Sequence, residues 1–242
     1  DVIALDVSTT TLGPTRSGLG TATANASYLL DGNGNAGLDA GAEVIDAVAL
    51  FVNTRPEAQD ERSGLTFDGV DDYVNMGSDA SLTMTNTMTM EAWVNPIDSP
   101  DSVTGSKIII NKEGEYEVGM DAQTGDLKWA FDNTDPDWAW HNTGHYLSFG
   151  QWSHIAVTYN NGVVNTYVNG DLVDSYAGSG PIGDAYVGMD DLQIGARQNT
   201  TTQRFHGQID DVRIWNTTRS ESQIDANMNL ELTGAEAGLA GY

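Results

Sequence analysis

The chain has 242 residues and a formal net charge of −25, because ten Lys and Arg residues stand against 35 Asp and Glu residues. This acid excess argues against nucleic acids and anionic membranes as partners, since their phosphates would be repelled, and no run of 18 apolar residues predicts membrane insertion. The absence of Cys excludes disulfides, thiolate metal sites and a cysteine nucleophile, and the length suits one domain with or without an appended segment.

Residues 1–62 are predicted to form an N-terminal segment that packs on, or completes, a domain formed by residues 63–242. Within this segment, residues 2–7 have the character of a strand. Residues 43–52 fit a strand or a short helix, because their periodicity does not separate the two. The sequence does not indicate the role of this segment.

From residue 65 onward, short β-rich runs alternate with Gly, Asn and Asp turns, which is typical of an all-β sandwich. The clearest strand alternates apolar and polar residues from Met88 to Val94 and ends at Pro96. Asn161-Gly162 and Asn169-Gly170 predict hairpin turns, because both residue types accept positive φ. The other predicted strands are 107–111, 116–120, 127–131, 152–159, 163–168, 172–176, 192–196 and 205–215.

One helix is predicted near residues 221–232. Ser220 can cap it, and Gln223 follows three residues later, as in a capping box. Ile224, Met228 and Leu232 recur at helical spacing, and Gly234 ends the segment. Together these residues predict one short C-terminal helix.

Five segments, in this order and spacing, resemble the laminin-G-like branch of the concanavalin A-like lectin/glucanase superfamily. The resemblance implies an all-β jelly-roll sandwich of two antiparallel sheets, a common calcium site, and membership of secreted or cell-surface bacterial proteins. The tail at residues 221–242 resembles a link to a further module, so we expect the chain to be part of a longer repeat protein. The segments are 65–74 (LTFDGVDDYV), 90–94 (MEAWV), 152–159 (WSHIAVTY), 167–170 (YVNG) and 207–215 (GQIDDVRIW).

The first predicted calcium site joins the first and last strands of the sandwich. Asp210, Val212 and Ile214 are two residues apart, so on a regular strand they share one face. Val212 and Ile214 are expected to face the core, so Asp210 is expected to point inward as well. A carboxylate there is costly unless it is paired or bound to a metal. The resemblance implies that Asp210 shares a calcium ion with Asp68, the acid of the Phe-Asp-Gly motif at residues 67–69. The alternative is an Asx-turn without a metal, with Asp210 only capping a strand. The predicted ligands are Asp68 and Asp210, with Asp71 or Asp72 and the carbonyls of Gly69 and Gly207 as helpers.

The second predicted calcium site is a Gly/Asn-rich loop at residues 31–39. Its oxygens fall at positions 1, 3, 5 and 9 of an EF-hand-type loop, on Asp31, Asn33, Asn35 and Asp39. The match is imperfect, because the glycine falls at position 7 and Ala42 occupies position 12. A flexible turn without metal is the alternative.

An aromatic and polar loop predicts a carbohydrate site. Trp138 and Trp140 are two residues apart, so on an extended segment their indoles share a face and can stack on a sugar ring. Asp132, Asp135 and Asp137 of this loop could also hold a calcium ion that coordinates sugar hydroxyls. The alternatives are that both Trp residues fill the core, as predicted for Trp93 and Trp152, and that Arg197 forms an ordinary salt bridge. The predicted carbohydrate-binding residues are Trp138, Trp140, His141, Asp135, Asp137, His145 and Arg197.

The sequence predicts no enzyme. Retaining glycoside hydrolysis needs two carboxylates about 5–5.5 Å apart, and the glucanase branch supplies them from a Glu-x-Asp-x-x-Glu-like run that this chain lacks. Glu117 and Asp121 have the wrong spacing, Glu91 has no acidic neighbour on its strand, and His154 is interpreted as structural.

The sequence therefore predicts a non-catalytic, calcium-dependent, lectin-like adhesion module. It is expected to be monomeric, exported by a bacterium, and displayed beside other modules of one chain, with a glycan as its ligand. Three alternatives stay open. They are a calcium-rigidified spacer without a ligand, a polysaccharide hydrolase or an accessory module of one, and a protein-binding adhesive domain whose acidic surface favours a basic partner.

Overall fold

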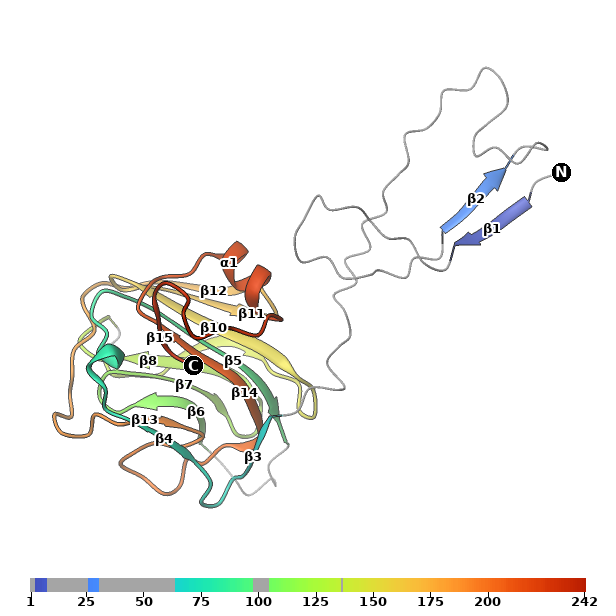
Figure 1. The fold of residues 1–242 in the computed structure, drawn as a ribbon. Helices are drawn as coiled ribbons and strands as arrows, with labels where there is room; N and C mark the ends of the chain where they lie inside the picture. The colour runs from blue at the N-terminus through green and yellow to red at the C-terminus, as the bar shows by residue number, and fades with distance from the viewer. Residues whose placement is uncertain (1–2, 8–25, 31–63, 98–104, 136) are drawn as a thin grey trace. The chain divides into compact units, whose positions relative to one another are not determined.

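The computed structural model describes residues 3–7, 26–30, 64–97, 105–135 and 137–242 (Figure 1). The chain divides into two units, Asp1–Gln59 and Asp60–Tyr242. In the first unit, β1 (Ile3–Val7) pairs antiparallel with β2 (Ala26–Leu30), which confirms the predicted strand at residues 2–7. The predicted segment 43–52 and the calcium loop 31–39 lie outside the described residues. The packing of residues 1–62 on the sandwich stays a prediction.

The second unit is a sandwich of two antiparallel sheets, which confirms the predicted all-β class. The seven-stranded sheet has, in spatial order, β12 (Asp171–Ala177), β11 (Val163–Val168), β10 (Ser153–Asn160), β5 (Thr87–Pro96) and β14 (His206–Trp215). The far edge of β14 pairs with both β3 (Leu65–Asp68) and β15 (Leu239–Gly241). The six-stranded sheet has the order β4 (Val74–Gly77), β13 (Leu192–Ile194), β6 (Ser106–Lys112), β7 (Tyr116–Asp121), β8 (Asp126–Phe131) and β9 (His141–Tyr146). A 3-10 turn, η1 (Ala80–Leu82), follows β4.

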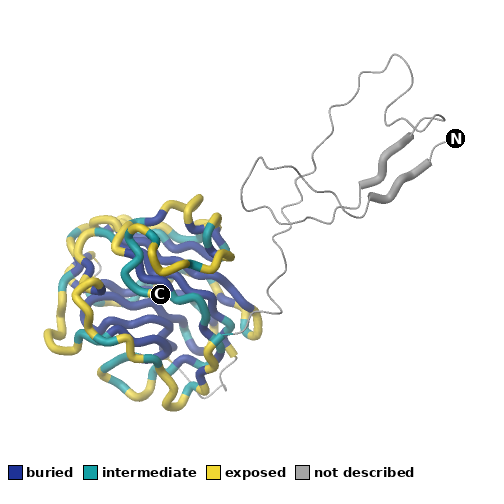
Figure 2. The backbone as a smooth tube through the Cα atoms, in the orientation of Figure 1, coloured by how far each residue is buried: buried dark blue, intermediate teal, exposed yellow. Residues whose placement is uncertain are grey.

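The hydrophobic core lies between the sheets, where the strands are buried in Figure 2. Met88, Met90 and Val94 of β5 face alternating apolar residues of the six-stranded sheet, as the period-2 pattern predicts. Trp93 and Trp152, expected in this core, are buried in a different place. They form a small cluster with Met228 on the outer face of the seven-stranded sheet. The hairpin turns at residues 161–162 and 169–170 have positive φ, which confirms their prediction.

The helix α1 (Glu221–Asn227) covers this outer face. The predicted capping box is confirmed, because Ser220 accepts from the Gln223 backbone and the Gln223 side chain bonds back to the Ser220 backbone. Ile224 is fully buried against the sheet in a cluster with Ala156 and Tyr167. Within the described residues, no helix is long and apolar enough to cross a membrane.

The helix ends five residues before the predicted residue 232, and side chains of the sheet explain the early end. Arg213 donates to the carbonyls of Asn227 (2.9 Å) and Leu230 (2.6 Å), and Trp93 Nε1 donates to the carbonyl of Met228 (2.7 Å). These donors occupy carbonyl groups that a longer helix would bond internally. The segment after α1 is therefore held to the sheet by tertiary contacts.

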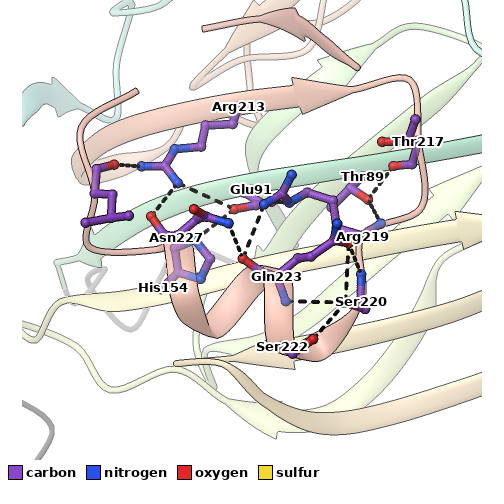
Figure 3. Close-up of polar contacts among 11 residues, drawn as sticks. Thr89, Glu91, His154, Arg213, Thr217, Arg219, Ser220, Ser222, Gln223 and Asn227 are labelled. Atoms are coloured by element: carbon purple, nitrogen blue, oxygen red, sulfur yellow. Dashed lines mark hydrogen bonds and ion pairs between the residues drawn. The ribbon is translucent and has the colours of Figure 1, made fainter. Parts of the chain in front are cut away.

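A buried ion network lies between α1 and the seven-stranded sheet (Figure 3). Glu91 is fully buried, and its Oε1 lies 3.2 Å from Arg219 Nε. Its Oε2 lies 3.5 Å from His154 Nε2 and 3.8 Å from Arg213 Nη1. One carboxylate therefore faces two guanidinium groups, and Arg219 also stacks on Trp215 with Cζ 3.9 Å from the ring centroid. Glu91 and His154 therefore have a structural role, since both are buried in the contact between α1 and the sheet.

Candidate functional site

The structure does not bring Asp68 and Asp210 together. Asp68 pairs with His206 across β3 and β14, and Asp210 lies four residues farther along β14. At about 3.4 Å per residue, this separates the two positions by roughly 14 Å along the strand. The prediction that these two residues share one calcium ion is therefore wrong.

A β-bulge explains why Asp210 does not point inward as the sequence predicted. The register of β14 shifts between Asp210 and Arg213, and Asp211 has a φ of 49°. Ile209 and Ile214 are five residues apart and both belong to the core, which an uninterrupted strand would not allow. Asp210 instead lies opposite Trp93, on the outer face of the sheet.

Asp68 belongs to an acidic turn at the end of β3. Its Oδ1 accepts from the amides of Val70 (2.8 Å) and Asp71 (3.3 Å), and Asp72 Oδ2 accepts from the amide of Asp68 (2.9 Å). The hydrogen bond from Val70 is the main reason why the pKa of Asp68 lies below its ordinary value. The Asx-turn that the sequence offered as an alternative is thus present.

The same turn also fits a hard cation. One oxygen of each of Asp68, Asp71 and Asp72 lies within 4.8 Å of the others. Oxygens that share a calcium ion at about 2.3–2.6 Å can be separated by that much. The helper positions Gly69 and Gly207 have a packing role, because an added Cβ would lie 2.9 Å from His206 Cβ and 2.3 Å from the Asn95 carbonyl oxygen, respectively.

Trp138 and Trp140 lie over the outer face of the six-stranded sheet. The Trp138 amide donates to the Phe131 carbonyl (3.0 Å), and its ring centroid lies 5.4 Å from the Arg197 guanidinium carbon. The Trp140 ring centroid lies 5.2 Å from Lys128 Nζ. Both Trp residues are half-buried and outside the core clusters, in contrast to Trp129 of the core. We call this surface the Trp138/Trp140 face.

A buried polar network supports this face. Arg197 Nε donates to Glu113 Oε2 (2.8 Å), and Arg197 Nη2 lies 3.3 Å from Glu117 Oε1. Asn111 Nδ2 contacts Glu117 Oε2 (3.0 Å) and Glu113 Oε2 (3.4 Å), and Asn199 Nδ2 donates to Glu113 Oε1 (2.8 Å). Both carboxylates are almost fully buried. The salt bridge expected for Arg197 and its contact with an indole therefore occur together.

Burial changes the acidity of this network. Desolvation raises the pKa of Glu117 to about 7, while the nearby Arg197 guanidinium opposes the rise. Desolvation also lowers the pKa of Lys128. The face thus combines two indole rings, two cations and buried carboxylates that fix the position of one cation.

Sequence reasoning missed Asn111, Glu113 and Lys128, and it considered Glu117 only as a catalytic acid with the wrong spacing. One signal could have found Glu117, because it alternates with the core residues Tyr116 and Val118 and must therefore lie on the outer face of β7.

His141 does not belong to the Trp138/Trp140 face. It lies opposite Trp129 in the register of β8 and β9, and its ring stacks on that core indole at 4.6 Å. Its Nε2 lies 3.0 Å from Asp174 Oδ2 on β12, so it joins the edges of the two sheets. These contacts give His141 a structural role, and its contact with a glycan stays a prediction.

The remaining predicted ligands lie along the loop and β9. Asp135 and Asp137 are exposed, and Asp137 Oδ1 accepts from the Asn133 amide (2.8 Å). His145 is half-buried on β9, where its amide donates to Thr143 Oγ1 (3.2 Å). Their contact with a glycan stays a prediction.

Comparisons with known proteins agree with this fold. A laminin-G family model, described as the concanavalin A-like lectin/glucanases superfamily, matches residues 68–225, which confirms the resemblance inferred from the sequence. No curated protein matches the chain significantly.

Two solved structures are similar. A candidate carbohydrate-binding protein from Bacteroides ovatus ATCC 8483 is 24% identical, with a TM-score of 0.56 over 74% of this chain and 51% of its own, so the chain spans about half its length. The CBM40 of Ruminococcus gnavus IT-sialidase, solved with α2,3-sialyllactose, is 14% identical, with a TM-score of 0.50 over 68% of this chain and 95% of its own. At these identities, both show the fold alone.

Proposed function

Because the chain belongs to the concanavalin A-like lectin/glucanase superfamily, we propose that it is a carbohydrate-binding module whose ligand lies on the Trp138/Trp140 face. The observation that carries the proposal is the pair of half-buried indoles, each with a cation beside its ring. Indole faces stack on the CH groups of sugar rings, and neighbouring polar groups then bind hydroxyls.

The network below the face supports ligand binding, because it fixes Arg197 before a ligand arrives. Glu113 and Glu117 hold two nitrogens of the guanidinium, and the Trp138 ring covers one side of it. A side chain held in place loses little conformational entropy on binding. The remaining guanidinium N–H groups can donate to sugar oxygens.

The proposal also includes a calcium site and the location of the protein. Calcium would be held by Asp68, Asp71 and Asp72, whose clustered oxygens suit a hard cation. When bound, the ion would brace the turn after β3. We further propose a monomeric, non-catalytic adhesion module of a bacterial repeat protein outside the cell, where a net charge of −25 would keep the surface hydrated.

A glycan array followed by calorimetric titration tests the face. We expect Trp138→Ala and Trp140→Ala to weaken binding of the best array ligand at least tenfold, with an unchanged near-UV circular dichroism spectrum. Tyr73→Ala is the matched control, because Tyr73 is an exposed ring beside a cation, Arg204, next to β4 at the other edge of the sheet. Unchanged affinity in both Trp variants would refute the site, and their unfolding would favour the spacer alternative.

One observation favours a second candidate, hydrolysis of a polysaccharide. Glu113 and Glu117 approach the same amide nitrogen of Asn111, and burial raises the pKa of Glu117 to about 7, as in a general acid. Their burial under Arg197 opposes it, since a substrate would have to displace the guanidinium. Release of reducing ends from laminarin, agar or dextran that disappears in Glu117→Gln would establish this function in place of simple binding.

A further inference from the structure

The turn between β6 and β7 holds a carboxylate that is buried but only half satisfied. Glu115 is 3% exposed, and its Oε1 is paired with the Lys112 ammonium group. Among the described residues, no hydrogen-bond donor reaches its Oε2, which is also buried. Burying a charged oxygen without a partner costs free energy, so this atom is expected to meet another positive group.

Two further carboxylates lie at the same place. Asp184 and Asp190 come from the segment between β12 and β13, and one oxygen of each lies within 4.8 Å of the other and of a Glu115 oxygen. Asp184 is exposed and Asp190 is half-buried, so the group opens to solvent on one side. Water can therefore complete the shell of an ion bound there.

Backbone contacts fix this arrangement. The Ala185 amide donates to the Gly114 carbonyl (2.9 Å), and the Tyr186 amide donates to Asp184 Oδ1 (3.0 Å). Gly114 lies so close to Tyr186 that an added Cβ would be 2.6 Å from the Tyr186 nitrogen. The segment that carries both aspartates is thus packed directly on the turn that carries Glu115.

The charges of the group do not balance. Three carboxylates face one ammonium group, Lys112, among the ion pairs of the described part of the chain. Like charges this close repel each other, and an oxygen-only ligand set of this kind is typical of hard divalent cations.

We propose that Glu115, Asp184 and Asp190 form a divalent-cation site, with calcium as its ion. The ion completes the partners of Glu115 Oε2 and leaves Lys112 on Oε1. It also stabilises the base of the Trp138 loop, because the Asp132 amide donates to the Glu115 carbonyl (3.0 Å) and the Gly183 amide to the Asp132 carbonyl (3.0 Å). The site is distinct from the Asp68 turn, and it does not depend on glycan binding.

Calorimetric titration of CaCl2 into the EDTA-stripped full chain tests the site. Asp184→Asn and Asp190→Asn are matched variants, since they keep side-chain size, and Asp184→Asn keeps the acceptor for the Tyr186 amide. We expect each variant to lose one bound calcium ion, or at least tenfold in the affinity of one ion. Asp71→Asn, in the other acidic cluster, should leave this ion in place.

A second measurement separates binding from folding. Terbium bound at the site should luminesce on excitation of tyrosine, because Tyr186 lies within two residues of Asp184. In an Asp71→Asn background, which removes the other acidic cluster next to Tyr73, we expect Asp190→Asn to lose this signal at least fivefold while its far-UV circular dichroism spectrum is unchanged. Calcium stoichiometry and affinity within twofold of wild type in both Asp184→Asn and Asp190→Asn would overturn the proposal. If MgCl2 binds with the same affinity as CaCl2, the proposal that calcium is the ion of this site would be wrong.

Discussion

The Glu91→Gln substitution removes one negative charge from the network under α1 without changing side-chain size. Two guanidinium groups lie 3.2 Å and 3.8 Å from the Glu91 carboxylate. At an effective dielectric of about 20, each contact corresponds to roughly 4–5 kcal/mol of Coulomb attraction, part of which desolvation already offsets. Removing one member of a buried ion pair generally destabilises a protein by about 3–5 kcal/mol, because the partner charge stays buried.

Remaining partners set the limits of this effect. Arg213 keeps Asp211 and two carbonyl acceptors, and Arg219 keeps the Gln223 carbonyl and the Trp215 ring. We therefore expect the free energy of unfolding to fall by about 3–5 kcal/mol, which corresponds to a Tm lower by roughly 6–20 °C for a domain of this size.

Thermal and guanidinium unfolding measure the change. Glu231→Gln is the matched control, since Glu231 is exposed, and it should change the free energy by less than about 0.5 kcal/mol. A double-mutant cycle with Arg219→Gln should give a coupling of at least about 1 kcal/mol. A Tm of Glu91→Gln within 2 °C of the control would refute the reasoning, because the two guanidinium groups would then be stable without the carboxylate.

Three further predictions follow from other contacts. Burial raises the pKa of Glu117 from its ordinary value of 4.5 to about 7, so its contribution to stability is complete below pH 4.5 and is lost as the pH rises through 7. The free energy of unfolding of Glu117→Gln should therefore rise relative to wild type between pH 4.5 and 8, by at most about 1.4 kcal/mol per pH unit. Guanidinium titrations with EDTA measure this difference, and a difference that does not change with pH would contradict the prediction. Ser220→Ala should lower the free energy of unfolding by about 0.5–2 kcal/mol through loss of the N-cap, whereas Ser222→Ala should not. His141→Ala should destabilise the fold by about 1–3 kcal/mol and leave glycan affinity within twofold, and a tenfold loss of affinity would return His141 to the binding site.

Local patterns predicted the strands and the start of the helix. Met88, Met90 and Val94 reach the core because alternation alone decides which face of a regular strand is buried. Ser220 and Gln223 cap α1 because their partners are only three residues apart. Features of this kind depend on neighbours in sequence, and one sequence is enough to predict them.

The bulge in β14 could not be predicted in the same way. Nothing in the Asp210-Asp211 pair announces the positive φ of Asp211, yet this one residue moves Asp210 to the opposite face. The early end of α1 has a similar cause, because Arg213 reaches it from the sheet. Both outcomes are set by tertiary contacts.

The candidate site was only partly predictable. Trp138 and Trp140 stood out because large aromatic residues are unusual in a polar, turn-rich segment. Glu113 was missed because its partner Arg197 is 84 residues away, and only the folded sheet shows why the acid is buried.

The cover that α1 provides on one sheet has a practical consequence for redesign. The side chains that keep this cover in place, from Glu91 to Arg219, are on the opposite surface of the sandwich from Trp138 and Trp140. Grafting residues 132–140 and 196–204 from a related module should therefore transfer its ligand preference to an unaltered scaffold. Such chimaeras offer a route to a series of binding reagents built on one frame.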